Sequence, residues 1–179
     1  MRLLPLLAAL LVLPAFAADK KEKTYELRDF AWGKAVSGPA ATPSKLAGKA
    51  VVLECWGVQC PPCIASLPHM QELSVKYKDT LTIVGAECQG HSPKEIGVVT
   101  KKAGVEYAIV SGLSKTPIEF SGIPKVFVFD NKGKLVFDGN PADAGFMEAV
   151  KKVAEKPDAK AAPATTPAPG AKPAAAKAV

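Results

Sequence analysis

Histidine and cysteine are both scarce in this chain of 179 residues, which contains two histidines and four cysteines. His69 stands alone in a stretch of helical character, and His91 follows Cys88 by three residues. One Cys-x-x-His pair supplies only part of the ligand set that a zinc site needs. The sequence therefore predicts no metal site and no cofactor.

Long hydrophobic runs are also missing, apart from one at the N-terminus. Arg2, the apolar run 3–13 and the small-x-small segment 15–17 match a secretory signal. The run is shorter than the roughly 20 residues of a membrane-spanning helix, and no cysteine follows it that could carry a lipid. We expect residues 1–17 to be a cleaved signal peptide, which places the mature chain in the periplasm or outside the cell without stable membrane insertion. An uncleaved anchor is the alternative.

A concentrated positive charge is missing as well, although the formal net charge is +6. Arg2 belongs to the signal, and the tail from Lys156 carries four lysines against Asp158, which leaves +2 on the part expected to fold. The remaining lysines are scattered, without a basic stripe that alternates with aromatic residues. A nucleic-acid partner is therefore not expected.

Large apolar residues are absent from the C-terminal segment until the final Val179. Residues 155–179 consist mainly of Ala, Pro, Lys and Thr, a composition that cannot bury a core. We expect a disordered, partly polyproline tail, with cell-wall association through its lysines as the functional alternative. One domain, residues 24–154, remains.

The stretch 51–63 carries the chemistry of that domain. Val51–Leu53 is an apolar, β-rich run of the kind found in strands that are covered on both faces. Gly57 breaks the run, and 64–77 has helical character. The pattern predicts a buried strand, a tight turn and then a helix.

Two cysteines open this helix. Cys60 and Cys63 are separated by Pro61 and Pro62, which suit first helical positions because N–H groups there lack intrahelical acceptors. The helix dipole favours a thiolate at Cys60. The alternative is a permanent disulfide, but a staple around so short a loop adds little stability. The spacing thus favours redox chemistry, with Cys60 as nucleophile and Cys63 as resolving thiol.

Residues 56–68 resemble the active site of the thioredoxin superfamily, and the Trp56 and Pro-Pro elements resemble its TlpA-like extracytoplasmic thiol–disulfide oxidoreductases. The similarity runs from about Tyr25 to Val153 and is also strong over 121–130. It implies an α/β, thioredoxin-like fold with a central mixed β-sheet, helices on both faces and an N-terminal β-hairpin extension. Gln59 stands where the family usually has Trp, a departure that bears on substrate choice and redox potential.

The resemblance implies an enzyme that reduces protein disulfides in the periplasm, of the cytochrome c maturation or copper-site assembly type. Its partners would be oxidised protein thiols and a membrane thiol-transfer protein that donates electrons. A strong oxidant requires a stabilised reduced form, and no histidine lies between the cysteines to stabilise the thiolate. The sequence therefore favours a reductant over an oxidant. Cu(I) delivery by Cys60 and Cys63 remains the alternative. A peroxidase is disfavoured because Val58 and Gln59 occupy the region where its threonine would stand.

The resemblance also implies a substrate-binding surface around the cysteines. Pro124 follows Ile123 just before a strand, where the family has a cis peptide bond facing the disulfide and a backbone that receives an extended substrate. An ordinary trans proline is the alternative. Trp56 is expected beside the disulfide, and Pro61 and Pro62 complete the predicted surface.

Glu54 is the third predicted catalytic residue. Strand alternation puts it on the same side as Val52 and Trp56, under the active-site helix. Burial should raise its pKa, so it could accept the proton of Cys63 through a bridging water. The alternative is an ion pair with a lysine such as Lys76.

Cys55 and Cys88 stand in a repeated Glu-Cys-x-Gly pattern at the ends of two predicted strands. Neighbouring strands lie about 4.8 Å apart, so a second disulfide is conceivable. Two unpaired, buried thiols are the favoured expectation, since free cysteine usually behaves as a small hydrophobe.

The other predicted elements follow an α/β alternation that ends in a hairpin. They are strands at 24–30 and 35–36, a helical turn at 44–46, a strand at 81–87, a helix at 93–103 closed by Gly104, a strand at 107–110, irregular chain over 111–121, strands at 125–130 and 134–138 and a helix at 142–153.

Overall fold

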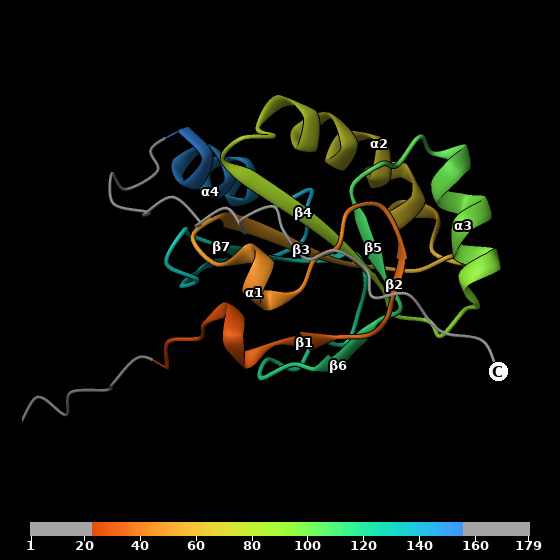
Figure 1. Cartoon of the computed structure of the whole chain (residues 1–179), viewed down its shortest axis with the longest axis horizontal. Helices are drawn as coiled ribbons and strands as arrows, with labels where there is room; N and C mark the ends of the chain where they lie inside the picture. Colours follow the sequence, from red (N-terminus) through yellow and green to blue (C-terminus); the bar gives the residue numbers. More distant parts are fainter. Residues whose placement is uncertain (1–22, 156–179) are drawn as a thin grey trace, which may run out of the picture.

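Six strands form the central sheet, in the order β2-β5-β4-β3-β7-β8 (Figure 1). The computed structural model describes residues 23–155. β3 pairs in parallel with β4 and antiparallel with β7, so the predicted mixed sheet is confirmed. The strands are β2 (Ala35–Ser37), β3 (Ala50–Trp56), β4 (Leu81–Glu87), β5 (Ala108–Val110), β7 (Lys125–Phe129) and β8 (Leu135–Gly139).

Helices cover both faces of this sheet, as predicted. α2 (Pro61–Lys76) and α4 (Ala144–Glu155) pack on one face, where they share a core with Cys60 and Cys63; we call it the disulfide-side core. The other face is covered by α1 (Pro43–Leu46) and the 3-10 helix η1 (Leu27–Asp29), which enclose the opposite core. α3 (Pro93–Lys102) lies beside β2 and β5 (Figure 1).

β3 occupies the middle of the sheet, and all seven of its residues are buried. Its side chains alternate between the two cores, with Val52 and Trp56 in the disulfide-side core and Val51 and Leu53 in the opposite core. A strand that is apolar on both sides can pack against the helices on both faces of the sheet. The fold therefore delivers the end of β3, and the turn after it, to a fixed place.

The N-terminal segment differs from its prediction. The strand predicted over 24–30 is not formed: Glu26 makes one isolated β-bridge to Lys134 and Leu27–Asp29 form η1, because Leu27 and Phe30, three residues apart, both face the opposite core. The Asp29 carboxylate also caps this turn by accepting the N–H of Glu26 at 2.9 Å. The N-terminal extension is present as two antiparallel strand pairs, β1 (Ala31–Trp32) with β6 (Leu113–Lys115) and β2 with β5. The prediction of irregular chain over 111–121 was therefore wrong at β6.

The other predicted helices and strands from residue 35 onward are confirmed to within two residues, except that β3 extends three residues past 53 and α2 begins three residues before 64. Gly104 follows α3 with a φ of 69°, as a residue that closes a helix does. Gly133 has a φ of 80° in the hairpin between β7 and β8.

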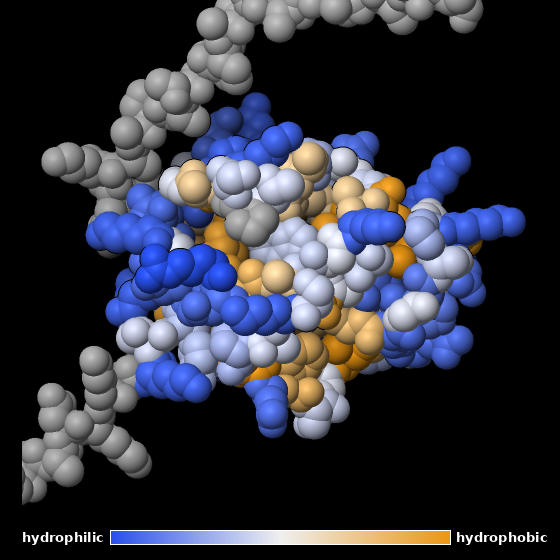
Figure 2. All heavy atoms as spheres, turned by 60° about the horizontal axis from the view of Figure 1, so that its bottom comes forward, coloured by the Kyte–Doolittle hydropathy of each residue, from blue (hydrophilic) through white to orange (hydrophobic). Residues whose placement is uncertain are grey.

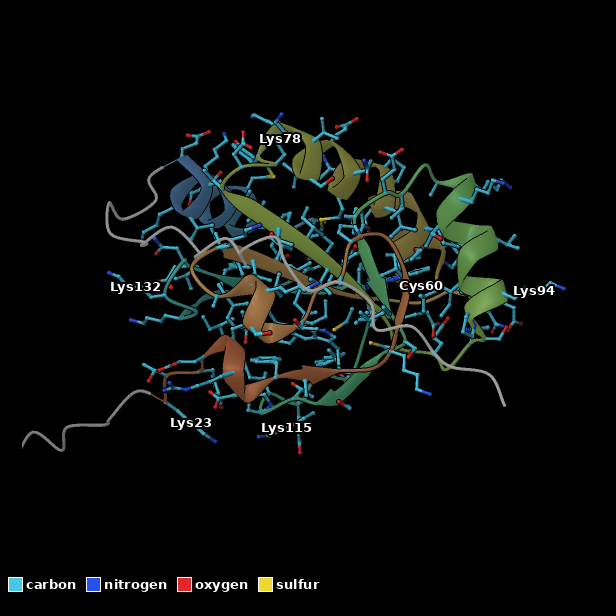
Figure 3. All side chains as sticks on the ribbon, viewed as in Figure 1. Lys23, Cys60, Lys78, Lys94, Lys115 and Lys132 are labelled. Carbon is cyan, nitrogen blue, oxygen red and sulfur yellow. A yellow bond between two sulfur atoms is a disulfide. The ribbon has the colours of Figure 1, made fainter. Side chains whose placement is uncertain are left out.

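The surface carries scattered charge. The labelled lysines of Figure 3 project outward from several sides of the molecule. Figure 2 turns the lower side of Figure 1 forward and shows apolar surface among hydrophilic side chains. Within residues 23–155 no helix has the length and apolarity to cross a bilayer. The predicted signal peptide (1–17) lies outside the described residues, as does the predicted tail beyond Glu155, the last helical residue.

Candidate active site

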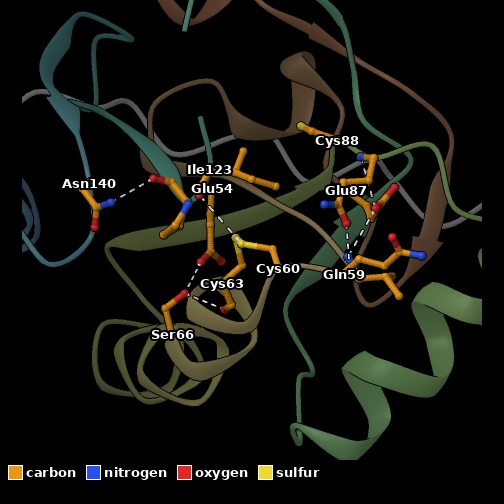
Figure 4. Close-up of a disulfide and its surroundings, with 12 residues drawn as sticks. Glu54, Gln59, Cys60, Cys63, Ser66, Glu87, Cys88, Ile123 and Asn140 are labelled. Atoms are coloured by element: carbon orange, nitrogen blue, oxygen red, sulfur yellow. Dashed lines mark hydrogen bonds between the residues drawn. A yellow bond between two sulfur atoms is a disulfide. The ribbon is translucent and has the colours of Figure 1, made fainter. Parts of the chain in front are cut away.

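Cys60 and Cys63 form a disulfide at the start of α2, with their Cα atoms 5.2 Å apart (Figure 4). Cys60 is the N-cap residue, and Pro61 and Pro62 are the first two residues of the helix. Cys60 is 7% exposed, whereas Cys63 is fully buried. The predicted pairing is confirmed. Cys60 is the less buried partner, and we call its sulfur the rim sulfur.

The loop before β7 lies against this disulfide. The Ile123–Pro124 peptide bond is cis, as the resemblance implied. The Ile123 carbonyl oxygen is 3.8 Å from the Cys60 Sγ. Asn140, directly after β8, donates its Nδ2–H to the Pro124 carbonyl at 3.3 Å (Figure 4). Asn140 was not among the predicted site residues, since only the β7–β8 pairing brings it there.

The other predicted substrate-binding residues divide by exposure. Pro61 and Pro62 are exposed beside the disulfide. Trp56 is fully buried in the disulfide-side core, so it packs under the turn and offers no indole surface to a partner. Gln59 is exposed, and its backbone N–H donates to the Gln89 side chain at 2.7 Å.

Glu54 is fully buried on the side of the sheet that carries α2. Its carboxylate accepts hydrogen bonds from Ser66 Oγ at 2.9 Å and from the Tyr107 hydroxyl at 3.1 Å. Burial raises the pKa of Glu54 to about 7, although these two hydrogen bonds act against the rise. The alternative ion pair with Lys76 is not formed, because that ammonium lies over the Tyr77 ring.

Ser66 links Glu54 to the disulfide. Its hydroxyl contacts the Glu54 carboxylate and, at 2.8 Å, the Cys63 carbonyl oxygen. Figure 4 shows the Glu54 side chain reaching toward the turn of α2 that holds Cys63 and Ser66. The Glu54 carboxyl is thus connected through Ser66 to the backbone carbonyl of Cys63. The contact between Ser66 and Glu54 was not predicted, because the two residues belong to different elements, α2 and β3.

Glu87, at the end of β4, was not predicted as a site residue. Its buried carboxylate accepts the backbone N–H groups of Val58, Gln89, Gly90 and His91 at 3.0–3.4 Å, and it contacts His91 Nδ1 at 2.9 Å. Burial acts to raise the pKa of Glu87, but hydrogen bonds from His91 and from backbone N–H groups lower it overall. This carboxylate fastens the turn before Cys60 to the loop before α3.

Replacing Glu87 with alanine should lower the free energy of unfolding by about 3 kcal/mol, because four backbone N–H groups lose the acceptor they share. The lowered pKa sets the pH dependence: the stabilisation is present above the unfolded value near 4.5 and is lost as the pH falls through the folded pKa. Urea unfolding of wild type, Glu87→Ala and Glu87→Gln in neutral and acid buffer measures both effects. Glu106→Gln, an exposed site, is the control. An unchanged midpoint in Glu87→Ala would contradict this role.

Cys55 and Cys88 are free thiols. Cys55 is buried, as predicted, whereas Cys88 is exposed, which corrects the expectation that both are buried. The second disulfide is not formed. Residues 23–155 contain no cluster of three or more candidate metal ligands. His69 is surface-exposed, 3.7 Å from the exposed Glu72 carboxylate.

No family model matches the chain. Among curated proteins, it is 27% identical over 104 residues to the thiol-disulfide oxidoreductase ResA of Halalkalibacterium halodurans, covering 56% of this chain and 59% of that one. A ResA of Bacillus thuringiensis subsp. konkukian is 25% identical over 140 residues, which cover 75% and 72% of the two chains. A ResA of Bacillus cereus is 33% identical over 98 residues and 54% of its length. The chain thus spans little more than half of several of these relatives.

Solved structures show the same architecture. A thiol-disulfide isomerase from Corynebacterium glutamicum superposes with a TM-score of 0.60 at 17% identity, over 75% of this chain and 97% of that one. A DsbF homologue from Corynebacterium diphtheriae gives a TM-score of 0.61 at 19% identity, over 73% and 87%. At such identities the likeness establishes the fold. The chain therefore adopts the thioredoxin-like fold, with ResA-type thiol-disulfide oxidoreductases among its sequence relatives.

Proposed function

We propose that this protein is a thiol–disulfide oxidoreductase that exchanges electrons with protein disulfides through Cys60 and Cys63. The observation that carries the proposal is the disulfide at the start of α2, which combines a rim sulfur with a fully buried one. Sequence similarity to ResA proteins supports the same reaction. Of the two cysteines only Cys60 keeps some exposed surface, so substrate disulfides are expected to react there.

In the reduced protein, Cys60 is the nucleophile. It lies at the N-cap of α2, where the helix dipole stabilises a thiolate. The thiolate attacks one sulfur of a substrate disulfide, forms a mixed disulfide and expels the other substrate sulfur as a thiol. Cys63 then attacks Cys60 Sγ, which releases the reduced substrate and closes the protein disulfide. Glu54 accepts the proton that Cys63 loses.

An extended substrate segment would lie across the rim. The Ile123 carbonyl is close to the Cys60 sulfur and supplies a backbone acceptor, while Pro61, Pro62 and Pro124 border the same opening. Backbone pairing of this kind gives affinity with little sequence preference. The surface thus suits several protein disulfides.

We assign the net direction as reduction, in the periplasm or outside the cell, with electrons from a membrane thiol-transfer protein. Oxidised cysteines of apocytochrome c or of a copper-site protein are the substrate class proposed. The assignment rests on the absence of a histidine between the cysteines, because strong oxidants need a stabilised reduced form.

Three measurements test the proposal. The full chain should catalyse insulin disulfide reduction by dithiothreitol, and no acceleration over the uncatalysed rate would refute the activity. Equilibration in glutathione buffers gives the reduction potential, and a potential near that of strong oxidants would refute the direction. Cu(I) titration of the reduced chain completes the comparison, since tight one-to-one binding would favour copper delivery.

A further inference from the structure

Two cysteines lie outside the candidate active site, on the other face of the central sheet. Cys55 belongs to the opposite core, whereas Cys60 and Cys63 belong to the disulfide-side core. Cys88 is the first residue after β4 and is exposed. The proposed reaction uses neither of these thiols.

The strand register explains why these two cysteines meet. Cys55 pairs with Ala86 in the parallel β3–β4 ladder. The ladder continues past its last pair, because the Cys88 N–H donates to the Trp56 carbonyl at 2.8 Å. Side chains two residues apart on a strand point to the same face. Cys88 therefore lies on the same face as Ala86 and diagonally adjacent to Cys55.

The same register accounts for the repeated Glu-Cys-x-Gly pattern. Glu54 and Glu87 point toward the side of the sheet that holds the active-site disulfide, where both are buried. Their neighbours Cys55 and Cys88 consequently point to the other side. Each strand end thus supplies one carboxyl to the candidate active site and one thiol to the opposite face.

The two thiols affect each other's pKa and differ in environment. The interaction with Cys55 lowers the pKa of Cys88, and the backbone N–H of Leu113 adds to the effect. The same contact, together with burial, raises the pKa of Cys55. The Cys88 Sγ is 3.3 Å from the Ala86 carbonyl oxygen. Ala86 pairs with Cys55 in the β3–β4 ladder, so this contact holds the Cys88 sulfur on the side of Cys55. Cys88 is exposed and Cys55 is buried, so an external disulfide has access to Cys88.

We propose that Cys55 and Cys88 form a second thiol–disulfide exchange site, in which exposed Cys88 attacks low-molecular-weight disulfides and buried Cys55 resolves the product. Cys88 thiolate attacks one sulfur of the disulfide, so that a Cys88 mixed disulfide forms and one small thiol leaves. Cys55 attacks Cys88 Sγ, the Cys55–Cys88 bond forms and a second small thiol leaves. The protein loses two electrons and two protons, which reduce one external disulfide to two thiols.

Both cysteines of the second site are direct sequence neighbours of residues that support the first site. Cys55 directly precedes Trp56, and Cys88 directly follows Glu87, the carboxylate that fastens the turn before Cys60. Closing the second disulfide would link the ends of β3 and β4 covalently beneath that turn. The two dithiols therefore lie on opposite faces of one strand pair. Oxidation of Cys55 and Cys88 would constrain the strand ends that precede the Cys60 turn.

The test uses the full chain with Cys60→Ser and Cys63→Ser, so that its outcome is independent of the proposed function. The protein is incubated with oxidised glutathione, denatured, alkylated and weighed by mass spectrometry. We expect both remaining thiols to be protected from alkylation, with a mass lower by two hydrogen atoms and a Cys55–Cys88 linked peptide after digestion.

Two further variants in this background assign the roles. Cys55→Ala, which puts no unpaired polar group into the core, should hold a glutathione adduct on Cys88 at least about tenfold longer. Cys88→Ser should leave Cys55 fully alkylatable. Two alkylated thiols in the parent, or a stable adduct on Cys88 while Cys55 is present, would overturn the proposal.

Discussion

Replacing Cys60 with serine should abolish insulin reduction, because the hydroxyl is a poor nucleophile and the buried Cys63 cannot reach a substrate. Replacing Cys63 should instead arrest the reaction after its first step. The Cys60 mixed disulfide would then persist, because its resolving thiol is gone. The two substitutions at one disulfide are thus expected to fail in different ways, one without a substrate adduct and one with it.

A trapping experiment separates these failures. Because Cys88 is a second exposed thiol, the variants are best compared in a Cys88→Ser background. Cys63→Ser should capture protein partners that a reductant releases, and the double variant Cys60→Ser, Cys63→Ser is the matched control that should capture none. Full insulin reduction by Cys60→Ser, or capture by the double variant, would contradict the role of Cys60. The captured proteins would also identify the substrates.

Local sequence was enough to predict the centre of the site. The segment from Val51 through Cys63 combines an apolar strand, a breaking glycine and helix-starting prolines, so each step depends on neighbours in the chain. The same holds for the hairpin at Gly133. Where neighbours compete, prediction failed: Leu27 and Phe30 fit an alternating strand loosely, but their shared burial makes the segment a 3-10 turn.

The surroundings of the site could not be predicted in the same way. The Glu54 carboxylate bonds to Tyr107, which lies 53 residues later in the chain, and Glu87 bonds to Val58, 29 residues earlier. Such contacts depend on strand register and on loop paths that no short pattern encodes. The burial of Glu54 followed from alternation, but its hydrogen-bond partners did not. The exposure of Cys88 was missed for a similar reason, because β4 ends one residue before it.

Glu54→Gln should stabilise the fold at alkaline pH. The pKa of Glu54 is about 7 in the folded chain and near 4.5 when unfolded. The native state therefore holds this proton more tightly, and the stability it contributes is complete below pH 4.5 and lost as the pH rises through about 7. A difference of that size corresponds to about 3 kcal/mol. Because the amide leaves one N–H group unpaired, we expect a net gain of roughly 2 kcal/mol at high pH in urea unfolding.

The same substitution should slow the resolving step. A buried carboxyl with a pKa of about 7, adjacent to Cys63 through Ser66, is well matched to accept a thiol proton at neutral pH. An amide cannot accept it, so we expect roughly a 100-fold slower closure of the Cys60 mixed disulfide and loss of the rate increase through neutral pH. Stopped-flow measurement of this closure from roughly pH 6 to 9 compares wild type, Glu54→Gln and Glu148→Gln, an exposed control on α4. A Glu54→Gln protein that is more stable yet resolves at the wild-type rate throughout would show that Glu54 is a buried acid without a part in proton transfer.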